Sequence, residues 1–298
     1  MPFLESSAEM SAPVAQKITS LVSKPTLLDM SKSIDLQSVG VQQWNARGQN
    51  FDVNWSRAGN VAATVSVASE DEIMVLVLDA SVNMVGIYAS AEAPARHVCI
   101  LPAGTWRLEL NPGATCVTLR SLREDVNSNA LNEFAYVERD ARLVPVGPAY
   151  HPLNGDGIRL LDIDKVVPPG DKARLKILQS STLSINYVEY EGPRDRTALS
   201  PHSHAAFEQG SLGLAGSFVH HLRTPWTEDA TTWQDDRHAQ LGAPSLMVVP
   251  AGLIHTSEGV GPGKHILIDV FSPPRADFIA KGWVANSMDY AAQDGVAG

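Results

Sequence analysis

The chain has 298 residues, of which 44% are hydrophobic and 19% are charged, and its formal net charge is −10. Such a composition is typical of a globular protein with a sizeable core and about two domains. The acidic balance, without a basic patch, argues against nucleic acid or an anionic membrane as a partner. The N-terminus lacks a basic region followed by an apolar run, and Ile73 to Leu78 is far shorter than the roughly 18–20 residues that span a bilayer. A cytoplasmic protein is the default expectation.

Residues 1–50 are predicted to form an N-terminal arm, with a short helix that begins near Pro13 because proline suits a first helical turn. From Val53 onward the sequence alternates or runs apolar over short stretches separated by Gly, Pro and Asn. Many short strands with turn punctuation predict an all-β sandwich or barrel. The strands expected in this half are Val61–Val67, Ile73–Leu78, Met84–Tyr88, Val98–Leu101, Arg107–Leu110 and Cys116–Leu119.

Two cysteines, Cys99 and Cys116, are too few for a disulfide framework. We expect two reduced thiols in the core rather than a disulfide across a hairpin.

The polar and turn-rich segment from Asn127 to Gly157 is typical of a connection between domains. It predicts one domain over residues 51–145 and a second over residues 146–298, the latter with a C-terminal tail. Further strands are expected at Ile158–Val167, Lys172–Tyr190, Ser217–Leu222 and His265–Phe271.

The stretch Pro-His-Ser-His-Ala-Ala-Phe-Glu places His202 and His204 two residues apart. On a strand, alternate side chains share a face, so the two imidazoles are expected to point the same way, and Glu208 has the same parity. Two imidazoles and a carboxylate on one wall predict a site for a borderline transition metal.

A second motif, Pro250-Ala251-Gly252-Leu253-Ile254-His255, places a turn just before another histidine. Together the two motifs resemble those of the cupins, over roughly Leu175 to Phe278, although many cupins have Asn where this chain has Gly259. The resemblance implies that His202, His204, Glu208 and His255 hold one metal inside a small antiparallel barrel. The peptide from Phe271 to Phe278 also resembles that of metal-binding cupins, including a pectin-catabolism group.

The competing interpretation is two surface histidines and an unrelated core histidine. The distribution of histidines favours the metal site, because seven of the nine in the chain cluster between residues 202 and 265: His202, His204, His220, His221, His238, His255 and His265. Of the adjacent pair His220 and His221, only one can face inward.

The first half repeats part of this pattern. Pro102-Ala103-Gly104 matches Pro250-Ala251-Gly252, and the alignment places Arg107 at the fourth ligand and Glu72 at the carboxylate. The chain is therefore expected to consist of two tandem cupin-type (double-stranded β-helix, jelly-roll) barrels with few short helices. The N-terminal barrel is expected to hold no metal, and a buried Glu72–Arg107 ion pair would replace the ion. The alternatives are an unrelated β-domain, or an Arg107 that a one-residue register slip turns toward solvent.

The segment from Arg223 to Pro244 is long for a connection in a compact barrel. It predicts a lid, with Trp233, Asp235 and His238 near the metal, His238 in a catalytic role and Arg223 among the pocket residues. Aromatic residues that plug the barrel wall are the alternative. A carboxylate or phosphate substrate would need a cation, for which Arg194, Arg223 and Arg237 are candidates.

The ligand set implied by the resemblance leaves a divalent metal near +1, with two open positions for water, O2 or a chelating substrate. We expect one divalent metal, with Fe as the leading candidate ahead of Mn, Ni, Cu and Zn. The leading hypothesis is a dioxygenase for a small enolisable or aromatic compound, with Glu208 as ligand and base. The alternatives are a redox-neutral isomerase or lyase for a keto-sugar or related acid, and a non-catalytic bicupin that binds metal or ligand. A small-molecule substrate and a homodimer are the expected partners.

Overall fold

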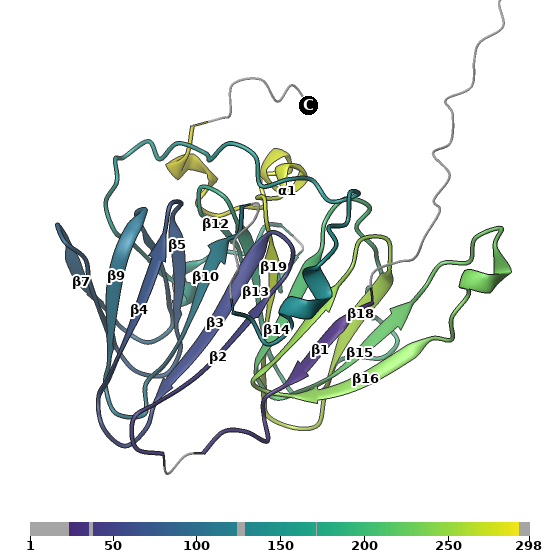
Figure 1. Ribbon diagram of the computed structural model, residues 1–298, viewed down its shortest axis with the longest axis horizontal. Coiled ribbons are helices and arrows are strands. Elements are labelled where there is room, and N and C mark those ends of the chain that lie inside the picture. The colour runs from purple at the N-terminus through teal and green to yellow at the C-terminus, as the bar shows by residue number, and fades with distance from the viewer. Residues whose placement is uncertain (1–23, 36–37, 124–128, 171, 292–298) are drawn as a thin grey trace, which may run out of the picture.

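The structure, a computed structural model, describes residues 24–35, 38–123, 129–170 and 172–291. Figure 1 shows two groups of strands side by side: one is mostly purple to teal, and the other is mostly green to yellow but includes the purple strand β1. Within the described residues, helices are limited to α1 and four 3-10 turns. The all-β fold with few short helices is confirmed, whereas the helix predicted near Pro13 lies outside the described residues.

The N-terminal barrel consists of a six-stranded and a four-stranded antiparallel sheet. The larger has the order β11-β8-β5-β10-β3-β2 and the smaller β4-β9-β6-β7. Their bounds are β2 (Val41–Arg47), β3 (Phe51–Ala58), β4 (Ala63–Ser69), β5 (Ile73–Val77), β6 (Val82–Val85), β7 (Ser90–Ala93), β8 (His97–Leu101), β9 (Gly104–Leu110), β10 (Thr115–Ser121) and β11 (Arg159–Asp162).

The C-terminal barrel has a six-stranded sheet of order β1-β17-β14-β19-β13-β12 and a three-stranded sheet of order β16-β15-β18. The strands are β1 (Thr26–Asp29), β12 (Ile177–Gln179), β13 (Ser184–Glu191), β14 (Gln209–Ala215), β15 (Ser217–Arg223), β16 (Arg237–Gly242), β17 (Ser245–Val249), β18 (Ile254–Val260) and β19 (Lys264–Phe271). The helical elements of the chain are η1 (Glu133–Tyr136), η2 (Ile163–Lys165), η3 (Ala230–Thr232), α1 (Ala276–Ala280) and η4 (Ser287–Asp289).

Corresponding strands of the two barrels occupy the same positions in the two large sheets. In each sheet one edge strand, called here the borrowed strand, comes from the other half of the chain. β1 comes from the predicted arm but pairs with β17, so that Thr26 lies opposite Val248. β11 follows the connection between the halves but pairs with β8 of the N-terminal barrel, with Arg159 opposite Ile100. The predicted boundaries at residues 50 and 145 therefore do not separate the barrels, because edge strands pair with whichever sheet offers free backbone groups.

The largest apolar cluster is shared between the two six-stranded sheets. Met74 and Leu76 of β5 and Leu246 and Val248 of β17 belong to it, whereas Val75 of β5 packs inside its own barrel. Both faces of β5 and β17 are thus buried, which explains why these strands are continuous apolar runs rather than alternating ones. Packing across the shared cluster fixes one barrel against the other.

The two cysteines flank the central strand β5. Cys99 lies opposite Val75 and Cys116 opposite Val77, on β8 and β10. Both thiols are buried and free, and burial raises the pKa of each to about 12. The prediction of reduced core thiols is confirmed.

The ion pair predicted between Glu72 and Arg107 does not form. In β9 the core-facing residues are Trp106 and Leu108, so Arg107 points outward, is 55% exposed and pairs with Glu109 at 2.9 Å. Glu72 is buried and pairs with Arg159 of β11. The borrowed strand therefore supplies the cation that sequence comparison assigned to Arg107.

Candidate metal centre

Three histidines from the two motifs converge on one point. The backbones of His202 and His255 pair as a bridge, with N–O distances of 3.0 and 2.7 Å, so their side chains share a face. The turn at Gly252 (φ +88°) donates its N–H to the carbonyl of His204 at 2.8 Å. One ring nitrogen from each of the three histidines lies within 4.8 Å of the others. The Pro-x-Gly turn thus ties the second motif to the first.

Backbone carbonyls fix the proton on two of the three rings. His202 Nδ1 lies 2.8 Å from the carbonyl of Ser200, and His255 Nδ1 lies 3.0 Å from that of Leu253. A carbonyl only accepts, so Nδ1 carries the hydrogen and Nε2 presents a lone pair. Burial lowers the pKa of His255 to about 4, which keeps that ring in the neutral form that binds metals.

Gln209, which was not predicted, completes the group. Its Oε1 lies 2.9 Å from His204 Nε2 and 3.1 Å from His255 Nε2. Its amide nitrogen donates to Ser211 Oγ at 3.0 Å and to Asp269 Oδ1 at 2.9 Å, which fixes the orientation of the amide. Burial raises the pKa of Asp269 to about 6, against the opposing effect of its hydrogen bonds.

The contact between Gln209 and His255 indicates that these residues can bind a metal. His255 Nε2 bears a lone pair, and the amide oxygen that faces it at 3.1 Å is also an acceptor. Two facing acceptors repel one another unless a cation lies between them. The lone pairs of His202 Nε2 and His255 Nε2 and the amide oxygen of Gln209 are suitable donors for a divalent transition metal, so these residues fit, and the ring of His204 lies beside them.

Arg275 holds the third histidine. Its Nη1 lies 3.0 Å from His204 Nδ1, and because a guanidinium only donates, this nitrogen accepts; the hydrogen of the neutral ring is therefore on Nε2, which donates to Gln209 Oε1 at 2.9 Å. Burial, and then the charge of Arg275, lower the pKa of His204 to about 3. The guanidinium pairs with Asp277 at 2.8 Å and packs 4.3–5.1 Å from three aromatic rings, those of Phe207, Phe271 and Phe278. Arg275 belongs to the closing peptide that the sequence singled out, although no role was assigned to it.

Glu208 does not join the histidines, which corrects its predicted role as ligand and base. Its Oε2 accepts the backbone N–H of Gln49 at 2.6 Å, and burial raises its pKa to about 7. The chain is not a continuous strand here: it bends at Ala205 and Ala206 before β14 begins at Gln209. The bend changes the parity, so Gln209 faces the histidines and Glu208 faces the N-terminal barrel.

Glu208 and Glu72 are equivalent positions of the two halves. Each precedes the corresponding central strand, β14 or β5. Each accepts a backbone N–H from a turn of the other barrel, since Ser181 donates to Glu72 at 2.8 Å as Gln49 donates to Glu208. The alignment of the two glutamates was right, but both link the barrels.

Replacing Glu208 by Ala is expected to lower the free energy of unfolding by about 1–3 kcal/mol, because the buried N–H of Gln49 loses its acceptor. The metal content should be unchanged. Urea unfolding and metal analysis of the same preparation measure both, and loss of metal from a folded variant would restore Glu208 as a ligand.

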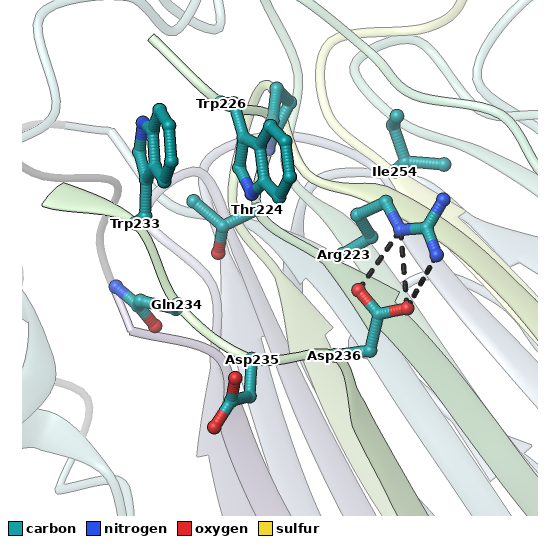
Figure 2. Close-up of a pocket in the computed structure, with 9 residues that line it drawn as sticks. Arg223, Thr224, Trp226, Trp233, Gln234, Asp235, Asp236 and Ile254 are labelled. Atoms are coloured by element: carbon teal, nitrogen blue, oxygen red, sulfur yellow. Dashed lines mark hydrogen bonds and ion pairs between the residues drawn. The ribbon is translucent and has the colours of Figure 1, made fainter. Parts of the chain in front are cut away.

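The three predicted pocket residues, Arg223, Trp233 and Asp235, do line one cavity of about 970 Å³. Figure 2 shows it between the ends of β15 and β16, where Trp226 and Trp233 stack with ring centroids 4.5 Å apart and Arg223 pairs with Asp236 at 2.5 Å. None of the clustered histidines lines this cavity. In Figure 1 the hairpin projects away from the barrel, so the predicted lid over the metal is not present in this structure.

His238 lies on the opposite face of the small sheet from the cluster. In the register of the small sheet, His238 lies opposite His221, and His221 lies opposite Thr256. His255, the neighbour of Thr256, lies opposite Leu222. Directly opposed residues share a face and neighbours along a strand alternate, so His238 and His255 point to opposite sides. His238 therefore does not point at the three-histidine group, as its predicted catalytic role would require, although it and His255 line one cavity of about 220 Å³.

Gly259, where many cupins have Asn, is required by a close approach. A Cβ there would lie 2.3 Å from the hydroxyl of Tyr190 and 2.8 Å from the ring of His265. The backbone N–H of Gly259 donates to that hydroxyl at 3.0 Å. Glycine at position 259, where many cupins have Asn, is therefore explained by packing against Tyr190 and His265.

No protein-family model and no curated protein sequence matches the chain. Solved structures do match it in fold. The oxalate decarboxylase of Lactobacillus farciminis, in a formate complex, has 13% identity and a TM-score of 0.56 over 86% of this chain and 88% of that one. A mutant of the Bacillus subtilis oxalate decarboxylase has 12% identity and a TM-score of 0.55 over 86% and 79%. AerE from Microcystis aeruginosa has 12% identity and a TM-score of 0.50 over 78% and 92%.

These neighbours are cupin-fold proteins, and the chain has their all-β jelly-roll fold together with a three-histidine group that can bind a metal. Among the described residues, no helix is both long enough and apolar enough to cross a membrane.

Proposed function

We propose that this protein is a metal-dependent enzyme that oxygenates a small enolisable or aromatic compound, which binds as a chelating anion. The observation that carries the proposal is the donor set. His202, His255 and the amide oxygen of Gln209 present lone pairs to one point, and the neutral ring of His204 lies beside them. The resident ion is one divalent transition metal, with Fe as the leading candidate and Mn, Ni, Cu or Zn as the others.

The charge of the site selects an anionic substrate. The donors, His202, His255 and the amide oxygen of Gln209, are all neutral and leave the full +2 charge of a divalent ion, where a Glu ligand would have left +1. The carboxylate of Asp269 lies behind Gln209 and does not reach the histidine group. An enolate, phenolate or carboxylate that chelates the ion would balance this charge in a partly buried site. A metal in this position supplies Lewis acidity and, if redox-active, one-electron chemistry.

The absence of a base in the group favours a substrate that is already ionised. Among the described residues, no Asp or Glu joins the three histidines, and Glu208 is bonded to Gln49. An isomerase needs a group that removes a proton from carbon. An acidic enol, phenol or carboxylate can bind ionised without one, so this arrangement supports the oxygenase over the isomerase.

Substrate would enter from the side of His202. This ring is exposed to solvent, whereas that of His255 is buried. Arg275 is 9% exposed and fully engaged with His204 and Asp277, so its role is to orient His204 rather than to bind substrate.

A redox-neutral decarboxylation or lyase reaction on a small acid is the second candidate. It is favoured by the likeness of the fold to oxalate decarboxylases. It also needs a chelating anion and no base for carbon, so the same donor set accommodates it.

Oxygen dependence separates the two. The protein would be reconstituted anaerobically with Fe²⁺, Mn²⁺, Ni²⁺, Cu²⁺ or Zn²⁺ and given a panel of β-diketones, catechols, enols and small dicarboxylates. The oxygenase predicts O2 uptake equal to the substrate consumed. Equal rates of substrate loss with and without O2, accompanied by CO2 release, would replace it with the decarboxylase.

Gln209→Glu is expected to weaken metal binding or activity by about 10-fold or more, although it introduces a better ligand. The new carboxylate would face Asp269 at the position where the amide nitrogen now donates at 2.9 Å. Two carboxylates at that distance cannot both be ionised without a large penalty. Adding Asp269→Asn should restore binding, and metal titration of both variants measures it. Tighter binding by Gln209→Glu alone would show that Asp269 does not set the identity of residue 209.

A further inference from the structure

A second group of histidines lies on the outer face of the small sheet of the C-terminal barrel. His221 on β15 is directly opposite His238 on β16, and their Nδ1 atoms are 2.7 Å apart. Glu258 of β18 lies on the same face, and its Oε2 is 3.0 Å from His221 Nε2. None of these three residues belongs to the group around His255.

The buried carboxylate fixes the proton on His221. The side chain of Glu258 is only 7% exposed, and its other oxygen lies 3.2 Å from Nε of Arg196. An ionised carboxylate only accepts, so His221 Nε2 carries the hydrogen and Nδ1 presents a lone pair. That lone pair faces His238, which is exposed and therefore free to adjust its position.

We propose that His221 and His238 bind a divalent transition metal through their Nδ1 atoms, at a site separate from the three-histidine centre. Imidazole pairs favour Zn²⁺, Ni²⁺ and Cu²⁺. Metal–nitrogen bonds of about 2.0–2.1 Å in tetrahedral geometry place two nitrogens roughly 3.3 Å apart, so the exposed His238 ring need shift by only about 0.6 Å. A cavity of about 220 Å³ beside the pair is lined by both histidines and Asp236, and on its other side by His255, whose side chain lies on the opposite face of the sheet.

In many metal sites the ring nitrogen that does not bind the metal donates its hydrogen to a carboxylate, and Glu258 accepts from His221 Nε2 in this way. The carboxylate sets the tautomer and raises the basicity of the ligating nitrogen. A metal here would join β15 to β16 at the base of the projecting hairpin, whose stacked Trp226 and Trp233 make their described contacts within the hairpin. The site would therefore anchor the hairpin.

Zn²⁺ titration of the full-length protein, followed by calorimetry and by metal analysis after dialysis, tests the proposal. The wild type is expected to bind two equivalents and His238→Ala one. Glu258→Gln should weaken the second site by about 10–100-fold. His151→Ala, an exposed histidine in neither group, is the matched control and should retain two equivalents.

The assignment is independent of the three-histidine centre, because His202→Ala should remove the other equivalent and leave this one. A hydrogen-bonded histidine pair that binds no metal predicts the same stoichiometry and affinity for wild type and His238→Ala. That result, or a single equivalent in the wild type that His202→Ala removes, would overturn the proposal.

Discussion

His255→Ala should release one equivalent of metal per chain and reduce any metal-dependent turnover to background. The side chain is buried, its Nδ1 hydrogen is committed to Leu253, and its Nε2 faces Gln209 at 3.1 Å. Without this imidazole only His202 and the amide oxygen of Gln209 still present lone pairs to the metal position. Metal analysis after dialysis and the oxygen-uptake assay are the measurements, and His202→Ala should behave in the same way.

The fold should survive His255→Ala, since the bridge between His202 and His255 is made by backbone atoms. His97→Ala is the matched control, because this partly buried histidine lies on β8 of the other barrel. Full metal occupancy in both His202→Ala and His255→Ala, with His97→Ala unchanged, would remove the assignment of the centre.

Glu72→Ala is expected to destabilise the protein by about 3–5 kcal/mol, because it leaves a largely buried guanidinium without its partner. Glu72 and Arg159 have side-chain exposures of 9% and 15%. The same carboxylate accepts the backbone N–H of Ser181 at 2.8 Å and the hydroxyl of Tyr290 at 2.9 Å. Removing it leaves several buried groups unsatisfied in both barrels at once.

Urea unfolding with tryptophan fluorescence measures this effect. Arg107→Ala is the control, since it breaks an exposed pair with Glu109 and should cost about 1 kcal/mol or less. Metal content should not change in either variant. A loss below 1 kcal/mol in Glu72→Ala would show that the pair contributes little to the contact between the barrels.

Local sequence was sufficient for several of the strands, among them β5, β8, β10 and β15, and for the three histidines of the candidate metal centre. Ile73–Val77 and Ser245–Val249 are buried on both faces, and the first of these was predicted directly from its apolar run. His202, His204 and His255 were identified from spacing and from the turn at Gly252, and the structure brings them together. These features depend on side-chain alternation and backbone turns over a few residues, which sequence patterns record well.

The sequence did not show which side chain faces the histidines after the bend in the chain. Glu208 and Gln209 are neighbours, and only the bend at Ala205 and Ala206 decides which of them faces the histidines. The same kind of one-residue shift turned Arg107 to solvent. Because side chains in a strand alternate every residue, a single change of register exchanges ligand for non-ligand without changing the composition of the motif.

Partners from distant parts of the chain were decided by tertiary structure alone. Arg159 of the borrowed strand β11 pairs with Glu72. The backbone N–H of Gln49, 159 positions away in the sequence, donates to Glu208. Arg275, which follows the last strand, contacts His204. Edge strands and connecting peptides have no periodic pattern that specifies their neighbours. Their positions follow from burial of the apolar cluster shared by the two large sheets, and that packing is what places a cation beside one glutamate and a backbone N–H beside the other.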